Sequence, residues 1–224
     1  MIIGQKNQEI IDMEKQQVFY IQGGDSFSKY ENYLEYLKVI DVSGLPTEEE
    51  SPVRWSKNLR EDLGDEFEVF TPAMPNKLNA SYKEWKIWFE RYLEYLHDDV
   101  ILVGWSLGGA FLSKYLIEND LPFKVKALFL LAAVYGDGSL VDEESGEDAG
   151  DFLYDVNRLS DIANKVGRIT IMHSKDDFVV PYEHALKYKE ALPEAALLTF
   201  EDKHHFLVEE LPELLTEIRK ISDR

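Results

Sequence analysis

The 224-residue sequence contains no cysteine. Disulfide bonds, thiolate zinc sites and a cysteine nucleophile are therefore excluded. Positive charge is also scarce, since 24 lysines and arginines stand against 43 aspartates and glutamates, which gives a formal net charge of -19. A surface this acidic repels phosphate groups, so we expect no nucleic-acid partner and no docking on anionic lipid.

Long apolar runs are absent as well. No stretch is long enough to span a membrane, and residues 1–16 lack the basic start and the apolar segment of a secretory signal. We therefore expect a cytoplasmic protein in which a leader, 1–16, precedes one domain, 17–224. Hydrophobic residues still make up 45% of the chain, enough for a substantial core.

Apolar segments typical of strands alternate with segments of helical spacing. This order predicts an α/β fold, with a mostly parallel central sheet, helices on both faces and little or no cap domain. Asp25 or Ser26 is expected to cap the first helix. The expected strands are 17–22, 67–71, 100–103, 125–134, 168–173 and 197–201. The expected helices are 27–39, a helix from Ser51-Pro52 to near Gly64, 81–96, 107–117, 182–191 and 207–221.

One acidic stretch lies between the fourth and fifth expected strands. Asp137–Asp151 carries seven acidic residues and no basic ones. The ligand spacing of an EF-hand is absent, so we expect no metal there. We expect residues 136–151 to form an acidic loop or a small lid.

The segment Gly104-Trp105-Ser106-Leu107-Gly108 matches the nucleophile elbow G-x-S-x-G. An apolar strand leads into it and a helical pattern follows, which is the context that this motif needs. The glycines allow a sharp turn that raises the Ser106 hydroxyl above the sheet edge. The N–H of Leu107 is then expected to point at the oxyanion that forms during attack on an acyl carbon.

A serine nucleophile needs a base and an orienting acid. In folds with this elbow the three follow the order serine, acid, histidine along the chain. Of five histidines, His204 and His205 follow the last strand, and we favour His205 because it directly precedes Phe206 and the final helix. Two adjacent carboxylates, Asp176 and Asp177, follow the strand before it, and spacing alone leaves both open as the acid.

A second oxyanion donor is expected from the loop after the first strand. Gly23-Gly24-Asp25 forms this loop, and glycine lets a backbone approach a substrate oxygen closely. The N–H of Gly24 is our first choice and the N–H of Asp25 the second.

Five segments together resemble the small serine hydrolases of the retinoblastoma-binding-protein / YdeN type, within the α/β-hydrolase superfamily. They follow in order from about Gln17 to the C-terminus: Gln22-Gly23-Gly24, Met74-Pro75, Gly104–Gly109, Asp176–Pro181 and His205-Phe206. The resemblance implies an α/β-hydrolase fold, with the acid at Asp177, four residues before the proline, and the base at His205.

Two departures from the family concern the acyl pocket. The second elbow position is usually histidine in these proteins and is Trp105 here, and Gln22 precedes Gly23 where histidine or proline often stands. Trp105 is therefore a candidate for substrate binding, Asp25 in the loop after the first strand is a second candidate, and the family leaves the substrate class open.

These features predict a serine hydrolase with Ser106, Asp177 and His205 as its triad. The expected substrate is a small acyl ester or thioester, cleaved through an acyl-enzyme without a cofactor or metal. Amide or C–C bond hydrolysis and acyl transfer are alternatives on the same triad. A protein-interaction module on the hydrolase scaffold is an alternative of another class.

Overall fold

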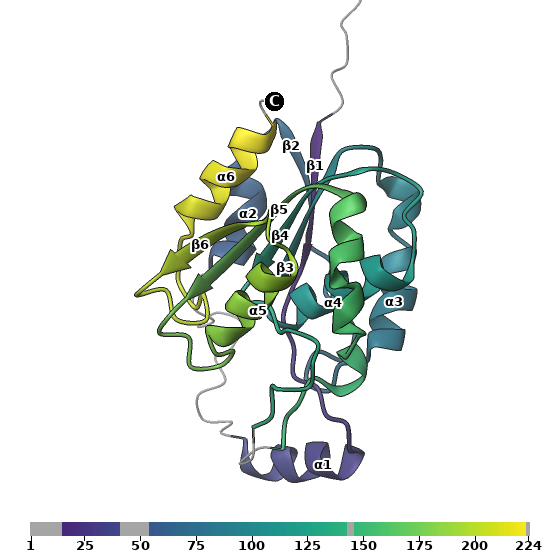
Figure 1. Ribbon diagram of the computed structural model, residues 1–224, viewed down its shortest axis with the longest axis vertical. Helices are drawn as coiled ribbons and strands as arrows, with labels where there is room; N and C mark the ends of the chain where they lie inside the picture. Colours follow the sequence, from purple (N-terminus) through teal and green to yellow (C-terminus); the bar gives the residue numbers. More distant parts are fainter. Residues whose placement is uncertain (1–14, 41–53, 143–145, 223–224) are drawn as a thin grey trace, which may run out of the picture.

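The computed structural model describes residues 15–40, 54–142 and 146–222. Six parallel strands form one sheet in the order β2-β1-β3-β4-β5-β6, with helices on both sides (Figure 1). The predicted fold class is thus confirmed. The strands are β1 (Gln16–Ile21), β2 (Phe67–Phe70), β3 (Val100–Trp105), β4 (Val125–Leu131), β5 (Val166–Ser174) and β6 (Ala196–Phe200).

The α-helices and short 3-10 helices complete the described chain. The α-helices are α1 (Tyr30–Val39), α2 (Trp55–Leu63), α3 (Tyr82–Glu90), α4 (Leu107–Glu118), α5 (Glu183–Ala191) and α6 (Pro212–Ser222). The 3-10 helices are η1 (Leu93–Tyr95), η2 (Gly150–Phe152) and η3 (Val156–Asn164), of which η2 and η3 were not predicted. Across the described residues, no helix is of a length and apolarity that would cross a bilayer.

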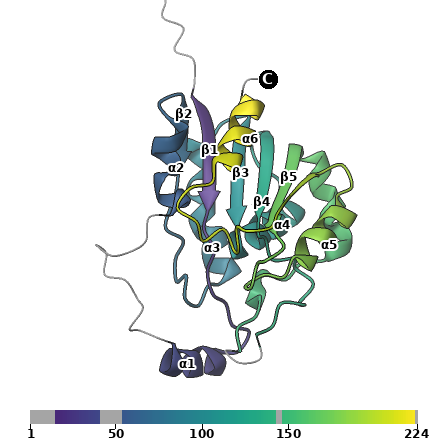
Figure 2. The same cartoon turned by 90° about the vertical axis from the view of Figure 1, so that its left-hand side faces the viewer.

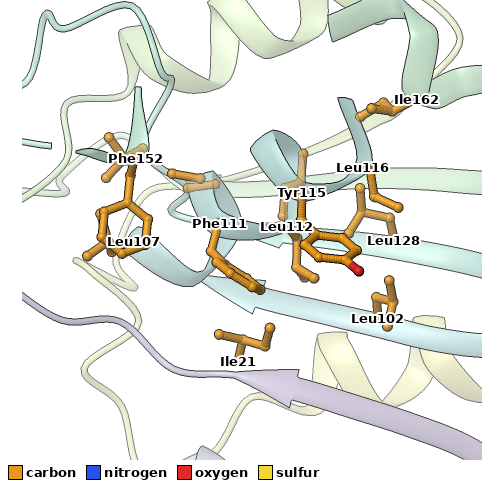
Figure 3. Packing of buried hydrophobic residues seen from close by; sticks show 14 of the residues in the cluster. Ile21, Leu102, Leu107, Phe111, Leu112, Tyr115, Leu116, Leu128, Phe152 and Ile162 are labelled. Carbon is orange, nitrogen blue, oxygen red and sulfur yellow. The ribbon is translucent and has the colours of Figure 1, made fainter. Parts of the chain in front are cut away.

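Alternation along the strands divides the core between the two faces of the sheet. Phe19 and Ile21 of β1 belong to the cluster under α3, α4 and α5, whereas Val18 and Tyr20 belong to the cluster under α2 and α6. Figure 3 shows the first cluster, in which side chains of α4 gather over the sheet. Because α4 follows the predicted nucleophile directly, this packing fixes the position of Ser106.

Three helices begin later than predicted, and one of them is α2, which begins at Trp55 after the N-cap residue Arg54 and not at Ser51-Pro52. The first begins at Tyr30, and its N-cap residue Lys29 makes no side-chain capping bond, so the capping role expected of Asp25 or Ser26 is wrong. The N–H of Asp25 donates to the carbonyl of Lys77 at 2.8 Å and thereby holds this segment against the loop after β2. The last helix begins at Pro212, where the fixed φ of proline suits the first helical position.

Two other predicted elements are shorter in the structure. The strand expected over 125–134 ends at Leu131, because Ala132 has a φ of 43° and its N–H turns to the carbonyl of Met172. The helix expected over 81–96 ends at Glu90 and continues as η1. The helix α2 ends as predicted, at Gly64 with a φ of 87°. The leader up to residue 14 and Ser51-Pro52 lie outside the described residues.

Helix α1 lies beyond the carboxyl ends of the strands, apart from the layers on the sheet (Figure 2). None of its residues is buried. Phe27 packs against Tyr33 and Tyr36, with ring centroids 5.6 and 5.3 Å apart, and Asn32 Nδ2 donates to the carbonyl of Gly146 at 3.2 Å. The helix and the acidic stretch are therefore joined near the end of the sheet that carries the elbow.

The acidic stretch uses its carboxylates to hold neighbouring segments. Asp148 Oδ1 accepts the N–H of Ser28 at 2.9 Å, and Asp151 Oδ1 accepts the N–H of Tyr82, the first residue of α3, at 2.6 Å. Asp137 forms an ion pair with Lys187 at 2.6 Å. Within 15–40, 54–142 and 146–222, no cluster of histidine and carboxylate side chains has a geometry that would hold a metal ion.

The raised pKa of Glu147 in this stretch is expected to make the free energy of unfolding depend on pH. Burial, together with the charges of Asp25, Asp142 and Asp148, raises its pKa to about 7. Because the folded pKa exceeds that of the unfolded chain, the folded state loses stability as the pH rises from about 4.3 through about 7. We expect Glu147→Gln to raise Tm by a few degrees at pH 8 and much less at pH 5, measured by thermal unfolding.

The control for this effect is Glu31→Gln, which makes the same charge change at an exposed position of α1. We expect it to alter Tm about equally at both pH values. Equal stabilisation by Glu147→Gln at pH 5 and pH 8 would show that the raised pKa is not the cause.

Candidate active site

Ser106 occupies the sharp turn between β3 and α4. Its φ of 55° and ψ of -122° lie outside the regions that L-residues favour. The N–H of Ser106 donates to the carbonyl of Leu131 at 2.9 Å, and its own carbonyl accepts the N–H of Gly109 at 3.0 Å. These bonds to β4 and to the start of α4 hold the strained backbone in place, because such strain persists only where the surrounding structure supports it.

Three glycines make this turn possible. A Cβ at Gly104 would lie 2.7 Å from the carbonyl oxygen of Gly108, and one at Gly108 would lie 2.6 Å from the carbonyl oxygen of Gln22. Gly23 packs directly on the serine, because a Cβ there would lie 2.9 Å from Ser106 Cβ. The elbow glycines were predicted, but this contact of Gly23 was not.

Asp177 and His205 meet at the carboxyl ends of β5 and β6. His205 Nδ1 lies 2.8 Å from Asp177 Oδ2, and both residues are buried. The other carboxylate oxygen, Oδ1, accepts the N–H groups of Val179 and Val180, each at 2.9 Å. Burial alone would raise the pKa of Asp177, but hydrogen bonds from His173, His205 and Val180 outweigh it and hold that pKa well below its usual range.

A second histidine, His173, also contacts the carboxylate of Asp177. Its Nε2 lies 3.2 Å from Asp177 Oδ2 and 2.8 Å from the carbonyl oxygen of Val180, and the residue is fully buried. Sequence analysis placed His173 at a strand end without a role. The signal available was its place at the end of the expected strand 168–173, four residues before Asp177.

The neighbouring Asp176 and His204 form a separate pair. His204 Nδ1 lies 2.8 Å from Asp176 Oδ2, while Asp176 Oδ1 accepts the Ser174 hydroxyl at 2.5 Å and the His204 N–H at 2.9 Å. The structure thus brings Asp177 to His205 and Asp176 to His204. The outer pair, Asp176 and His204, links the turn after β5 to the loop after β6.

Two indole groups hold the loop that carries His205. Trp105 Nε1 donates to the carbonyl of His205 and Trp55 Nε1 donates to the carbonyl of Phe206, both at 3.0 Å. The rings of Trp105 and His205 lie 5.4 Å apart. The loop needs such support, because His204 and Phe206 both have positive φ, 49° and 53°. Sequence analysis assigned Trp105 to substrate binding and missed Trp55.

We expect Trp105→Phe to lower kcat about tenfold with little change in KM. The phenyl ring fills most of the space but leaves a buried carbonyl unpaired, at a cost of about 1–3 kcal/mol, and it loosens the imidazole. Steady-state kinetics on an ester substrate would measure both constants.

The matched control is Trp55→Phe, which removes the corresponding bond one residue further along. We expect both variants to lower Tm by a similar amount, and we expect Trp55→Phe to lower kcat less than Trp105→Phe does. A rise in KM without a change in kcat for Trp105→Phe would instead support the role of Trp105 in substrate binding.

The two predicted oxyanion donors have no competing acceptor. In the part of the chain that the structure describes, neither the N–H of Gly24 nor that of Leu107 donates to a protein group. The second choice, the N–H of Asp25, does not fit, because it already donates to Lys77. The carboxylate of Asp25 lies 3.5 Å from the Tyr36 hydroxyl, and burial raises its pKa.

No protein-family model matches the sequence, and no curated protein matches it either. Solved structures do match, and they show that the chain has the α/β-hydrolase fold. The structure of the ydeN gene product from B. subtilis is similar at a TM-score of 0.65 and 17% identity, over 94% of this chain and 100% of that chain.

Two further similar structures are enzymes by description. The serine hydrolase of carbazole degradation, CarC, matches at a TM-score of 0.58 and 16% identity, over 93% of this chain and 91% of that one. A monoacylglycerol lipase from Paleococcus ferrophilus matches at 0.55 and 12%, over 93% and 95% of the two chains. At these identities the likeness shows a shared fold.

Proposed function

We propose that the protein is a serine hydrolase that cleaves small acyl esters or thioesters through an acyl-enzyme. The observation that carries the proposal is the 2.8 Å contact between His205 Nδ1 and Asp177 Oδ2 at the edge of the sheet where Ser106 stands on its strained turn. The similar solved structures that are described as a serine hydrolase and a monoacylglycerol lipase support the reaction class.

In the proposed first step, Ser106 Oγ attacks the acyl carbon and its proton passes to His205 Nε2. The tetrahedral oxyanion accepts hydrogen bonds from the N–H groups of Leu107 and Gly24. The imidazolium then protonates the leaving alcohol or thiol, which departs. Asp177 holds His205 with Nε2 toward the serine and offsets the positive charge on the ring.

In the second step a water molecule loses its proton to His205 and attacks the acyl-enzyme. Collapse of the second tetrahedral intermediate releases the acid, and the proton returns to Ser106 Oγ. Among the described residues Ser106 Oγ has no hydrogen-bond partner. Catalytic hydrogen bonds are often formed only in the substrate complex, so the proposal requires the approach of His205 Nε2 there.

The proposal is tested by a fluorophosphonate probe and an ester series. We expect one adduct per chain on the peptide that contains Ser106, and turnover of p-nitrophenyl esters that declines as the acyl chain grows from acetyl to decanoyl. Folded protein that gains no adduct and cleaves no ester would favour the interaction module.

Adding a meta-cleavage product to the ester series tests C–C bond hydrolysis, one of the alternative reactions. Among the similar structures is a meta-cleavage product hydrolase from Pseudomonas fluorescens IP01, matched at a TM-score of 0.57. Turnover of a meta-cleavage product that exceeds turnover of every ester would replace ester cleavage by C–C bond hydrolysis on the same three residues.

A further inference from the structure

His173 is placed between the catalytic acid and the backbone that shapes the turn after β5. Its Nε2 faces two oxygen atoms, the Val180 carbonyl at 2.8 Å and Asp177 Oδ2 at 3.2 Å. Both oxygens are acceptors, so Nε2 must carry the proton. The same oxygen of Asp177 receives His205 Nδ1, which gives one carboxylate oxygen two imidazole donors.

The other ring nitrogen of His173 indicates which tautomer is present. Nδ1 is buried and has no hydrogen-bond partner in the part of the chain that the structure describes. A second proton there would place an unpaired N–H and a positive charge in the interior, which is costly. The unpartnered Nδ1 therefore favours the tautomer that carries its proton on Nε2, from which the ring donates to Asp177 and Val180.

We infer that His173 is a positioning residue that holds the carboxylate of Asp177 toward His205 through its Nε2–H. This inference rests on the proposed function. Three donors besides His205 surround the carboxylate of Asp177, since His173 reaches Oδ2 and the N–H groups of Val179 and Val180 reach Oδ1. Both oxygens are thus fixed, and the carboxylate cannot rotate away from the imidazole.

The bond from His173 also adjusts the charge that Asp177 presents. A donor on Oδ2 draws negative charge toward itself, so less remains to stabilise the imidazolium of His205. The other titratable groups near His173 are Tyr182, whose ring lies 5.8 Å away edge-on, and His184 of α5. Burial lowers the pKa of His184 to about 4, so this group stays neutral over the working range of pH.

The test compares His173→Gln with His173→Asn, two neutral amides of different length. The Gln amide nitrogen reaches the place of Nε2 and keeps a donor for Asp177, whereas the Asn amide is too short. We expect His173→Asn to lower kcat by ten- to hundredfold with KM unchanged, the scale of one lost hydrogen bond to a charged group. His173→Gln should recover most of that loss.

The pH profile distinguishes positioning from general support of the fold. Without the donor, Asp177 stabilises the imidazolium more strongly, so the acid limb of kcat/KM should move to higher pH in His173→Asn and return in His173→Gln. His184→Leu, a change at a buried histidine without contact to Asp177, should leave the limb in place. An equal fall in both amide variants with an unmoved limb would overturn the inference.

A spectroscopic measurement needs no variant. The ¹⁵N shifts of His173 at neutral pH should show a protonated Nε2 and a bare Nδ1, and the opposite tautomer would contradict the inference. Should His173→Asn fail to fold, His173→Leu suits the buried site and replaces it. Wild-type protein that gains no fluorophosphonate adduct would count against the proposed function and not against this contact.

Discussion

Ser106→Ala should abolish fluorophosphonate labelling and lower ester turnover by about six orders of magnitude. The expected loss is large because, in the proposed mechanism, the serine oxygen forms the covalent bond to the acyl group and no other group of the elbow replaces it. Alanine removes only the hydroxyl and leaves the turn in place, since the bonds of residue 106 to Leu131 and Gly109 use backbone atoms. Intact-protein mass spectrometry and initial rates measure the two effects.

Ser113→Ala is the matched control for this change. Ser113 is buried about two turns further along α4, where its hydroxyl donates to the Gly109 carbonyl at 2.9 Å and meets the Tyr188 hydroxyl at 3.0 Å. We expect the Ser113 variant to label fully. An adduct that persists in Ser106→Ala, or that disappears in Ser113→Ala, would assign the nucleophile to another residue.

The fold could be predicted because its signals are local. Alternating apolar strands and helical patterns determine a parallel sheet with crossovers, and the glycines around Ser106 report the crowding of the elbow within a few residues of it. Gly108 illustrates this, since a Cβ there would strike the backbone of the neighbouring strand end at Gln22. Such a steric need appears in the sequence as a glycine at a fixed spacing.

The support of the histidine loop could not be predicted, because its contacts join residues far apart in the chain. Trp105 and His205 are 100 residues apart, and Trp55 and Phe206 are 151 residues apart. A tryptophan in an apolar sequence context is predicted to be buried, but the context does not predict which carbonyl accepts its N–H. The role of His173 was missed for a related reason, since periodicity gives the strand but not the direction of its last side chains.

The two aspartates show how far spacing alone can reach. Adjacent residues at a strand end point to different sides, so spacing indicated that one of them would meet His205 without saying which. The structure places Asp177 at His205 and gives Asp176 to His204, at 2.8 Å in both cases. The assignment of the catalytic acid is therefore a prediction with a paired test.

Asp177→Asn should lower ester turnover by three to four orders of magnitude. The oxygen of the Asn amide can keep the bonds to Val179 and Val180, which leaves the NH₂ group facing His205 and His173. Two donors then oppose each other, so His205 turns or adopts the wrong tautomer. Loss of the orienting carboxylate typically costs about 10⁴ in turnover, or about 5 kcal/mol of transition-state stabilisation.

Asp176→Asn makes the same chemical change one residue away and should stay within about tenfold of wild type, the scale of a lost peripheral contact. Its amide oxygen can still accept the Ser174 hydroxyl and the N–H of His204, and neutral His204 can accept from the new NH₂ group. Circular dichroism must first show that both variants are folded. A larger loss from Asp176→Asn than from Asp177→Asn in folded protein would move the catalytic acid to Asp176, and with it the base to His204.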